Sequence, residues 1–315
     1  METMQKIAFF SGVAKPAERL AACRVLTGGF PTQQREPAAK WLLSRFDEGL
    51  MNVHGLFVAR NVAGVIFAAA SLHLDEGAGA TMTSFRSAPG THQQGAEDSL
   101  IAAIDQHLRG QGVKVCQLIG NPAKAEEYRG LVRNGYLPPS RLVEMAIDTF
   151  PEPSSSSEST VIGPAVEIVP FREERAREFA ELLCETYVGT LDCPELNDVR
   201  TPGETLASLR GNSRAEQPHW SFVEVAGHPI GVVMLNPATA PQKWELTYLG
   251  LVPSHRFQGF GKALLTVALA TARDNRASGM ILTTDSRNLP AIRLYESAGF
   301  RPCGSYDVFL KLFNR

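Results

Sequence analysis

A proline- and serine-rich run near the middle of the chain divides this sequence into two halves of similar length. Residues 150–160 of this run show no apolar periodicity, which is typical of a flexible connector between separately packed units. The chain has 315 residues, enough for two domains that each bury a core. We therefore predict two domains, residues 1–150 and 166–315, joined by a linker at 151–165.

The two halves have the same predicted order of helices and strands. In the second half, hydrophobic periodicity predicts strands at 166–169, 220–225, 230–235, 244–252, 280–284 and 305–313, and helices at 173–187, after 201, at 262–275 and at 289–298. In the first half it predicts helices at 16–27, 36–49, 98–108 and around 126–133, and strands at 55–60, 65–72, 81–87, 113–118 and 142–147. The shared order indicates an internal duplication of one α+β unit.

Fixed offsets support the duplication. Gly95 follows Pro89 by six residues, as Gly259 follows Pro253, and Asn121 precedes a late helix in the first half as Asn288 does in the second. The duplication therefore extends to single turn residues.

Composition excludes several classes of protein. Hydrophobic residues make up 44% of the chain, charged residues 20%, and the formal net charge is −2, so we expect a globular protein with no overall field for nucleic acid. The five cysteines form no metal-ligand spacing, and no metal is predicted. The longest apolar run falls short of a membrane span, and the first residues lack a signal-peptide core, so we expect a cytoplasmic protein without membrane contact. The sequence leaves the oligomeric state open.

A glycine-containing loop in the second half is the main candidate for ligand binding. It lies between a strand and an apolar helix and consists of Arg256, Phe257, Gln258, Gly259, Phe260 and Gly261, followed by Lys262. Glycines allow close approach of the backbone, and the free N–H groups of a helix N-terminus attract phosphate. A glycine-rich turn without a ligand is the alternative. Other phosphate motifs fit less well, because Ala263 stands where a P-loop needs Ser or Thr, and Leu264 where a dinucleotide fingerprint needs Gly or Ala.

Two motifs together resemble the GCN5-related N-acetyltransferase (GNAT) superfamily. Arg-x-x-Gly-x-Gly after a strand is followed by Asn288-x-Pro-Ala-x-x-Leu-Tyr295-Glu-x-x-Gly299-Phe300. The resemblance implies two tandem GNAT-like domains, each a mixed, mostly antiparallel twisted sheet flanked by helices. It also implies that acetyl-CoA lies in a cleft where strands 244–252 and 280–284 splay apart.

The resemblance implies specific cofactor contacts and direct acetyl transfer, without a covalent enzyme intermediate. Main-chain groups of Leu249, Leu251 and Val252 would bind the pantetheine arm, residues 257–262 the pyrophosphate, and Asn288 the arm while it caps its helix.

Two residues are candidate catalysts. Tyr295 matches the position that protonates the departing CoA thiolate in many members of the family, although it could be an ordinary aromatic on a helix face. Glu245 lies on the central strand, where some members carry the base that deprotonates the amine; the alternative is a strand residue facing solvent or an arginine.

The first half departs from both motifs. Counting from Pro89 places His92, Gln94 and Gly95 opposite Arg256, Gln258 and Gly259, and Glu97 opposite Gly261. A carboxylate there would repel phosphate. Leu131 falls opposite Tyr295 and Thr81 opposite Glu245, although a shifted alignment would bring Tyr128 to the tyrosine position. We expect a degenerate first domain.

The acceptor is predicted to be a primary amine, either a small molecule or a peptide. Residues 185–210 would cover it, and the acidic side chains of this segment could attract a cation: Glu185, Asp192, Glu195 and Asp198. Such acids could equally form a solvated loop. The competing interpretation of the whole chain is a non-catalytic acyl-CoA-binding or partner-binding module on the same fold.

Overall fold

A computed structural model describes residues 7–150, 166–212, 219–240 and 242–313, with the side chain of residue 212 left out. The predicted linker at 151–165 lies outside the described residues. The chain forms two compact units. Unit 1 consists of Met1–Pro139 with Asp307–Arg315, and unit 2 consists of Ser140–Tyr306.

Unit 1 is a six-stranded sheet covered by helices. Its strands pair in the order β1 (Phe10–Val13), β2 (Leu56–Arg60), β3 (Ile66–Asp75), β4 (Gly79–Ser87), β5 (Val115–Gly120) and the last residues of β12 (Arg301–Leu312). Its helices are α1 (Arg19–Leu26), α2 (Thr32–Asp47), α3 (Gln93–Gly110) and α4 (Arg129–Arg133). Every helix and strand predicted for residues 16–133 is present, whereas β1 was not predicted.

Unit 2 repeats this arrangement. Its strands pair in the order β7 (Glu167–Pro170), β8 (His219–Val225), β9 (His228–Pro237), β10 (Lys243–Leu251), β11 (Gly279–Asp285) and β6 (Ser140–Ile147). Its helices are α5 (Ala176–Glu185), α6 (Pro202–Asn212), α7 (Phe260–Asp274) and α8 (Leu289–Ser297). Among the described strands, the parallel pairs are β4 with β5 in unit 1 and β10 with β11 in unit 2, so the predicted α+β fold with mostly antiparallel sheets is confirmed.

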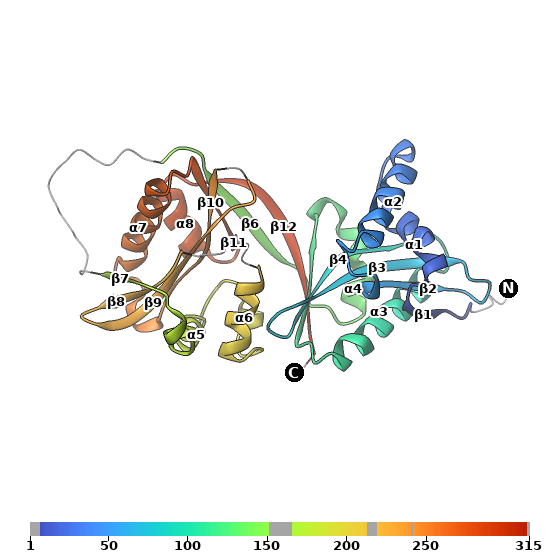
Figure 1. Cartoon of the computed structure of the whole chain (residues 1–315), viewed down its shortest axis with the longest axis horizontal. Coiled ribbons are helices and arrows are strands. Elements are labelled where there is room, and N and C mark those ends of the chain that lie inside the picture. The colour runs from blue at the N-terminus through green and yellow to red at the C-terminus, as the bar shows by residue number, and fades with distance from the viewer. Residues whose placement is uncertain (1–6, 151–165, 213–218, 241, 314–315) are drawn as a thin grey trace. The chain divides into compact units, whose positions relative to one another are not determined.

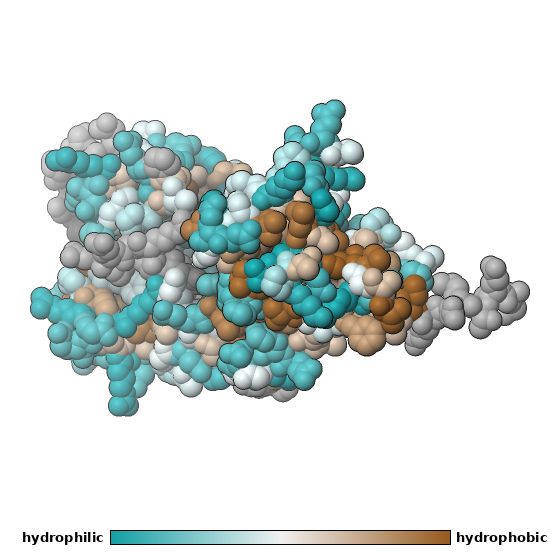
Figure 2. Space-filling model, turned by 45° about the vertical axis from the view of Figure 1, so that its right-hand side comes forward, coloured by the Kyte–Doolittle hydropathy of each residue, from teal (hydrophilic) through white to brown (hydrophobic). Residues whose placement is uncertain are grey.

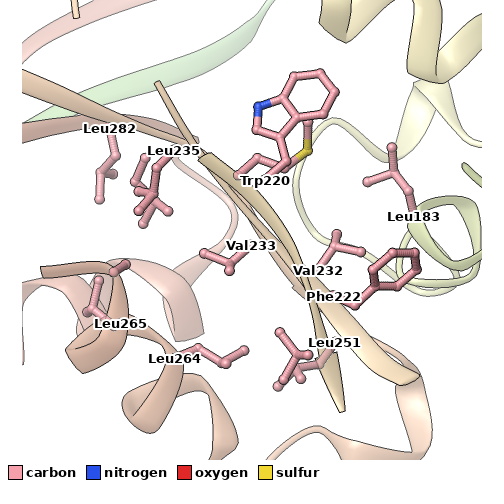
Figure 3. Packing of buried hydrophobic residues seen from close by; sticks show 14 of the residues in the cluster. Leu183, Trp220, Phe222, Val232, Val233, Leu235, Leu251, Leu264, Leu265 and Leu282 are labelled. Atoms are coloured by element: carbon pink, nitrogen blue, oxygen red, sulfur yellow. The ribbon is translucent and has the colours of Figure 1, made fainter. Parts of the chain in front are cut away.

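The core of unit 2 lies on both faces of its sheet. Figure 3 shows Leu183 of α5 on one side of the strands and Leu264 and Leu265 of α7 on the other. Phe222 and Val232 lie toward α5, and all five side chains are buried. Because alternate residues of a strand point to opposite faces, β9 contributes apolar side chains both to the layer of α5 and to the layer of α7.

The two units exchange their last strands. The predicted boundaries assign residues 142–147 to the first domain and 305–313 to the second. In the structure, β6 instead pairs with β11 in unit 2, over six residues from Leu142 to Ile147. The last part of β12, Asp307–Leu312, pairs with β5 in unit 1 (Figure 1). Local periodicity identifies a strand but not its partner, so the linker alone could not reveal the exchange.

Lys311 fixes the exchanged C-terminal strand in unit 1. Its ammonium group donates hydrogen bonds to the carboxylate of Asp105 on α3 and to the carbonyl oxygen of Asn134. It also lies 5.5 Å from the ring centroid of Tyr136, and Lys311 itself is buried. This one cation therefore links β12 to the helical layer of unit 1.

Replacing Lys311 with methionine is expected to lower the free energy of unfolding by about 3 kcal/mol, because Asp105 loses its cation. Burial raises the pKa of Asp105 even beside Lys311. Without the lysine this pKa rises further, so acid protonates the carboxyl readily and the loss shrinks as the pH falls. Urea unfolding at pH 7 and pH 5 measures the effect. Asp105→Asn added to Lys311→Met should recover stability at pH 7, and equal losses at both pH values would contradict the interpretation.

Several of the exposed apolar side chains in unit 1 lie on the edge strand β1 and at the β2–β3 turn, and others, such as Trp41 and Leu50, lie elsewhere on its surface. Phe10, Val13, Val62 and Val65 are all exposed, and Figure 2 shows hydrophobic patches among hydrophilic ones at the molecular surface. Scattered apolar residues are normal on a protein surface, and they identify no partner by themselves. Among the described residues, no helix combines the length and the apolar character needed to cross a membrane.

Candidate functional site

Strands β10 and β11 separate after a short parallel pairing. Lys243–Glu245 pair with Gly279–Ile281. In the described part of the sheet, the two strands form no further residue pairs beyond these three. The cleft predicted between these strands is therefore present. A cavity of about 260 Å³ lies there. Its walls come from the loop after α5, strand β10, the start of α7, and α8: Thr186, Gly189, Thr190, Leu191, Asp192, Leu246, Thr247, Tyr248, Leu249, Gly250, Leu251, Arg256, Phe257, Gly261, Thr283, Asn288, Pro290, Ala291, Leu294 and Tyr295.

A β-bulge determines which main-chain groups of β10 face this cavity. The register between β9 and β10 shifts between Leu246 and Tyr248. The N–H of Val252 donates to the carbonyl of Ile230 at 2.9 Å, so alternation directs the main-chain groups of Leu249 and Leu251 away from β9. The carbonyl of Leu251 accordingly accepts a hydrogen bond from Arg256 Nε at 3.0 Å. Without the bulge, the opposite set of residues would face the cleft.

Val252 requires a correction. The sequence predicts that its main chain binds the pantetheine arm, but its N–H donates to Ile230, and its carbonyl accepts from the N–H of His255 at 3.0 Å. Both main-chain groups are therefore occupied within the protein. Leu249 and Leu251 remain the candidates on this strand.

The N-terminus of α7 has the properties of an anion site. Its N-cap is Gly259, with φ of +88°, which a glycine adopts without strain, and no side chain caps the helix. The N–H of Lys262 already bonds the carbonyl of Gly259 at 3.1 Å. The N–H groups of Phe260 and Gly261 precede it in the first turn, where a helix has no intrahelical partner for them. Gly261 lines the cavity.

The side chains of the glycine loop point in different directions. Phe257 is 91% exposed and has a left-handed φ of +60°, which is strained for a phenylalanine. Gln258 donates to the carbonyl of Ser254, and Phe260 is buried in the core, so only its backbone can meet a ligand. Lys262 is exposed beside the helix end.

Arg256 lines the cavity and also makes contacts within the protein that the sequence did not predict. Its guanidinium donates to the carbonyl of Leu251 at 3.0 Å and to the carbonyl of Thr186, the last residue of the α5 turn, at 2.8 Å. It therefore fastens the end of α5 to the end of β10. Its charge remains at the cavity wall, but part of its hydrogen-bonding capacity holds the protein together rather than a phosphate.

Tyr295 and Asn288 lie together on the α8 side of the cavity. Tyr295 is only 8% exposed, lines the cavity, and has no hydrogen-bond partner for its hydroxyl among the described residues. Burial raises the pKa of the phenol above its usual range, and the charge of Asp192 adds to this effect. The phenol therefore keeps its proton at neutral pH. Asn288 caps α8 by accepting a hydrogen bond from the N–H of Ala291 at 3.4 Å.

Glu245 is not among the residues that line the described cavity. Burial raises the pKa of its carboxyl, and the charge of Glu144 on β6 adds to this rise. The carboxyl of Glu245 therefore interacts with a side chain of β6. Glu245 lies on the last residue pair that β10 shares with β11, where the strands are still joined. The sequence placed it correctly on the strand but could not show that the cleft opens only afterwards.

Asp192 is the acidic residue that the structure brings to the cavity. Its Oδ1 accepts a hydrogen bond from the N–H of Asp285, at the end of β11, over 2.7 Å. Burial raises the pKa of Asp192, and the charge of Asp285 adds to this rise. The sequence named Asp192 as one of four acids in a segment, without a signal that singled it out. Asp285, fully buried beneath it, was missed.

In the corresponding region of unit 1, charged side chains form ion pairs with one another. Glu97 is buried, with its carboxylate 2.8 Å from the guanidinium of Arg133, and it accepts a hydrogen bond from Ser87. Strand β4 likewise leaves β5 after three residue pairs, but Arg86 on β4 forms an ion pair with Glu127 at 2.8 Å. The predicted match of Glu97 with Gly261 needs a correction, because α3 begins at Gln93 and α7 at Phe260, so Glu97 is the fifth residue of its helix and Gly261 the second. Paired carboxylates thus lie in this region of unit 1, one turn into α3 rather than at its start.

Comparisons with known proteins agree with this geometry. Residues 177–300 match the model of the Acetyltransferase (GNAT) family. The chain is 34% identical to N-acetyltransferase family 8 member 2 of Rattus norvegicus over 96 residues, which is 29% of this chain and 42% of that protein. It is 37% identical to mycothiol acetyltransferase of Acidothermus cellulolyticus over 93 residues, 29% of this chain and 28% of that protein. The chain therefore spans less than half the length of these relatives.

Solved structures share the fold of the whole chain. A GCN5-related N-acetyltransferase from Sphaerobacter thermophilus matches with a TM-score of 0.55 and 17% identity, over 96% of this chain and 95% of that chain. A fungal glucosamine N-acetyltransferase region matches with a TM-score of 0.58 and 12% identity, over 98% of this chain and 38% of the other. At these identities the likeness concerns the fold alone. Among the described residues, no group of three or more His, Cys, Asp or Glu side chains could hold a metal.

Proposed function

We propose that this chain, a member of the GNAT superfamily, transfers the acetyl group of acetyl-CoA directly to a primary amine in the cavity of unit 2. One observation carries the proposal. The open edge of β10, the uncapped start of α7 and the unpartnered hydroxyl of Tyr295 all belong to the same cavity. The names of the curated relatives support an N-acetyltransferase activity.

The three features correspond to three parts of a thioester co-substrate. The N–H groups at the start of α7 would bind the pyrophosphate, as helix N-termini do. The main-chain groups of Leu249 and Leu251 would hold the pantetheine arm, and an N–H of this strand would stabilise the oxyanion that forms when the amine attacks. Asn288 would border the arm from the α8 side. Together these contacts would fix the thioester for attack.

Tyr295 would donate its proton to the departing thiolate. A phenol is a weaker acid than a thiol in water, and burial raises the pKa of Tyr295 further. The thiolate formed in the same dry cavity would also bind a proton more tightly, because burial disfavours its charge. The phenol therefore provides the proton where it is needed, and water need not enter.

Tyr295→Phe is expected to lower kcat by about a hundredfold, the lower end of the range for losing a general acid, with acetyl-CoA affinity unchanged. Free CoA release with a panel of amines measures turnover, and calorimetry measures binding. Tyr306→Phe is the matched control, because this hydroxyl contacts Glu144 and does not line the cavity.

Two results would count against the proposal. Acetyl-CoA binding without CoA release on any amine would favour a non-catalytic acyl-CoA-binding module. An unchanged kcat in Tyr295→Phe would remove the tyrosine from the mechanism while leaving the transfer itself intact.

For unit 1 we propose a scaffold without cofactor binding. The Glu97–Arg133 and Arg86–Glu127 pairs support this assignment, since a bound phosphate would have to compete with carboxylates that already hold the cations. The acceptor is proposed to be a small-molecule or peptide amine.

A further inference from the structure

We infer that Asp192 is the group that binds the acceptor ammonium and removes its proton, in place of Glu245. This inference rests on the proposed acetyl transfer and names the residue on the acceptor side of the same cavity. Asp192 and Tyr295 are both wall residues of the cavity, on the loop after α5 and on α8. Tyr295 is only 8% exposed and lines the cavity, and its hydroxyl has no hydrogen-bond partner among the described residues, which identifies the space between these elements as a place for a ligand.

A hydrogen-bonded network holds Asp192 in position. Asp285 is fully buried at the end of β11, donates its N–H to Asp192, and accepts the N–H of Cys193 at its own carboxylate, at 3.4 Å. The loop after α5 is thus fastened to β11 at two successive residues. These two hydrogen bonds hold the carboxylate of Asp192 at the cavity wall.

Arg287 completes this network. Its guanidinium contacts the carboxylate of Asp285 at 2.6 Å and that of Glu195 at 2.7 Å, and donates to the hydroxyl of Ser140 at 2.9 Å. Although burial works against it, these bonds from Arg287 hold the pKa of Asp285 below its usual range. Asp285 and Glu195 therefore stay ionised, and Arg287 offsets only part of their charge.

The resulting field favours a cation. Asp285 and Glu195 pair with Arg287, and Asp192 lies beside Asp285. Arg256 is the further cation at the cavity wall, so among these residues three carboxylates lie near two guanidinium groups. An ammonium group brought beside Asp192 would balance the charge, and the carboxylate could accept one of its protons. The titratable groups coupled to Asp192 from the surrounding elements are Asp285, Arg287, Cys193, Tyr187, Tyr248 and Tyr295.

The proposed step balances as follows. The ammonium R–NH3+ gives one proton to the Asp192 carboxylate, and the neutral amine attacks the thioester carbonyl. The C–N bond forms, the C–S bond breaks, and the thiolate takes the proton of Tyr295. The nitrogen loses its second proton as the amide forms, and this proton restores the Tyr295 phenolate to the phenol. After Asp192 and Tyr295 return to their starting states, the products are R–NH–acetyl, CoA thiol and one proton released to solvent.

The test is Asp192→Asn, which keeps the oxygen that accepts the Asp285 N–H but cannot take up a proton. With spermidine, glucosamine and a lysine-containing peptide as acceptors, kcat/KM is expected to fall at least a hundredfold for the acceptor that wild type uses. Acetyl-CoA affinity should be unchanged. The acid limb of the wild-type pH profile, where Asp192 becomes protonated, should disappear from the variant.

A stability measurement is independent of activity. Because the pKa of Asp192 is raised in the folded protein, its ionised form opposes folding above that pKa, and this penalty vanishes at acid pH. Asp192→Asn is therefore expected to raise Tm at pH 7 and to leave it unchanged near pH 3. Asp274→Asn, at the exposed last residue of α7 and away from the cavity lining, is the control and should change neither Tm nor rate.

The outcomes separate the inference from the proposed function. If none of the amines causes the wild-type protein to release CoA, the proposed acetyl transfer is contradicted, and the inference is contradicted with it. Active wild type with an unchanged rate and pH profile in Asp192→Asn overturns the role of Asp192 alone. A lower rate with a lowered Tm would show a merely structural role and would also overturn it.

Discussion

Residues 151–315 expressed alone are expected not to fold, whereas residues 140–306 are expected to fold and bind acetyl-CoA. A boundary placed at the linker removes β6 from the sheet of unit 2. Met145 and Ile147 of this strand are buried in the core of unit 2. Losing two such side chains costs about 2–5 kcal/mol each, which together can exhaust the stability of a typical domain.

The same boundary creates a second fault. Without β6, the edge of β11 loses its partner over six residues from Met280 to Asp285. Ser140 and Arg141 also leave, and with them the hydrogen bonds to Arg287 and to the N–H of Ser286. An exposed edge of this kind promotes aggregation. The 140–306 piece keeps all of these contacts and omits residues 307–315, which belong to unit 1.

Circular dichroism melting and calorimetry with acetyl-CoA measure the difference. The 140–306 piece should show a cooperative transition and wild-type affinity, and the 151–315 piece should show neither. Residues 166–306 provide a control that lacks β6 but also lacks the tail of β12. If 151–315 melts cooperatively and binds like 140–306, the strand exchange is not needed for folding.

Gly261→Glu is expected to weaken acetyl-CoA binding by roughly a hundredfold to a thousandfold. The substitution places a carboxylate in the first turn of α7, where we propose that pyrophosphate binds. Two like charges about 4 Å apart near a protein surface repel by about 4 kcal/mol, which corresponds to roughly a thousandfold. The carboxylate would also occupy the uncapped N–H groups of the helix.

Two controls separate charge from shape. In Gly261→Ala the added Cβ would meet Leu294 Cδ2 at 3.4 Å, an ordinary contact, so we expect less than a tenfold loss. Gly203→Glu introduces the same residue into open space at the start of α6 and should leave affinity unchanged. Calorimetry with acetyl-CoA measures all three. Normal binding by Gly261→Glu would undermine the proposed phosphate site at the start of α7.

The sequence by itself determined the local features of this protein. Hydrophobic periodicity predicted the helices and strands of both halves, and the spacing of Gly259, Gly261, Asn288 and Tyr295 placed them at the starts of helices and on the face of α8. These features depend on residues close together in the chain, so propensity, capping and periodicity are sufficient to predict them.

Only the tertiary structure decided which residues meet. The exchange of β6 and β12, the position of Asp192 over Asp285, and the clamp of Arg256 on Thr186 all join segments far apart in the sequence. The bulge between Leu246 and Tyr248 decided which residues of β10 turn their main chain toward the cavity, because a shift of one residue reverses the two edges of a strand. Pairing over such separations depends on the packed sheet, and no local pattern in the sequence encodes it.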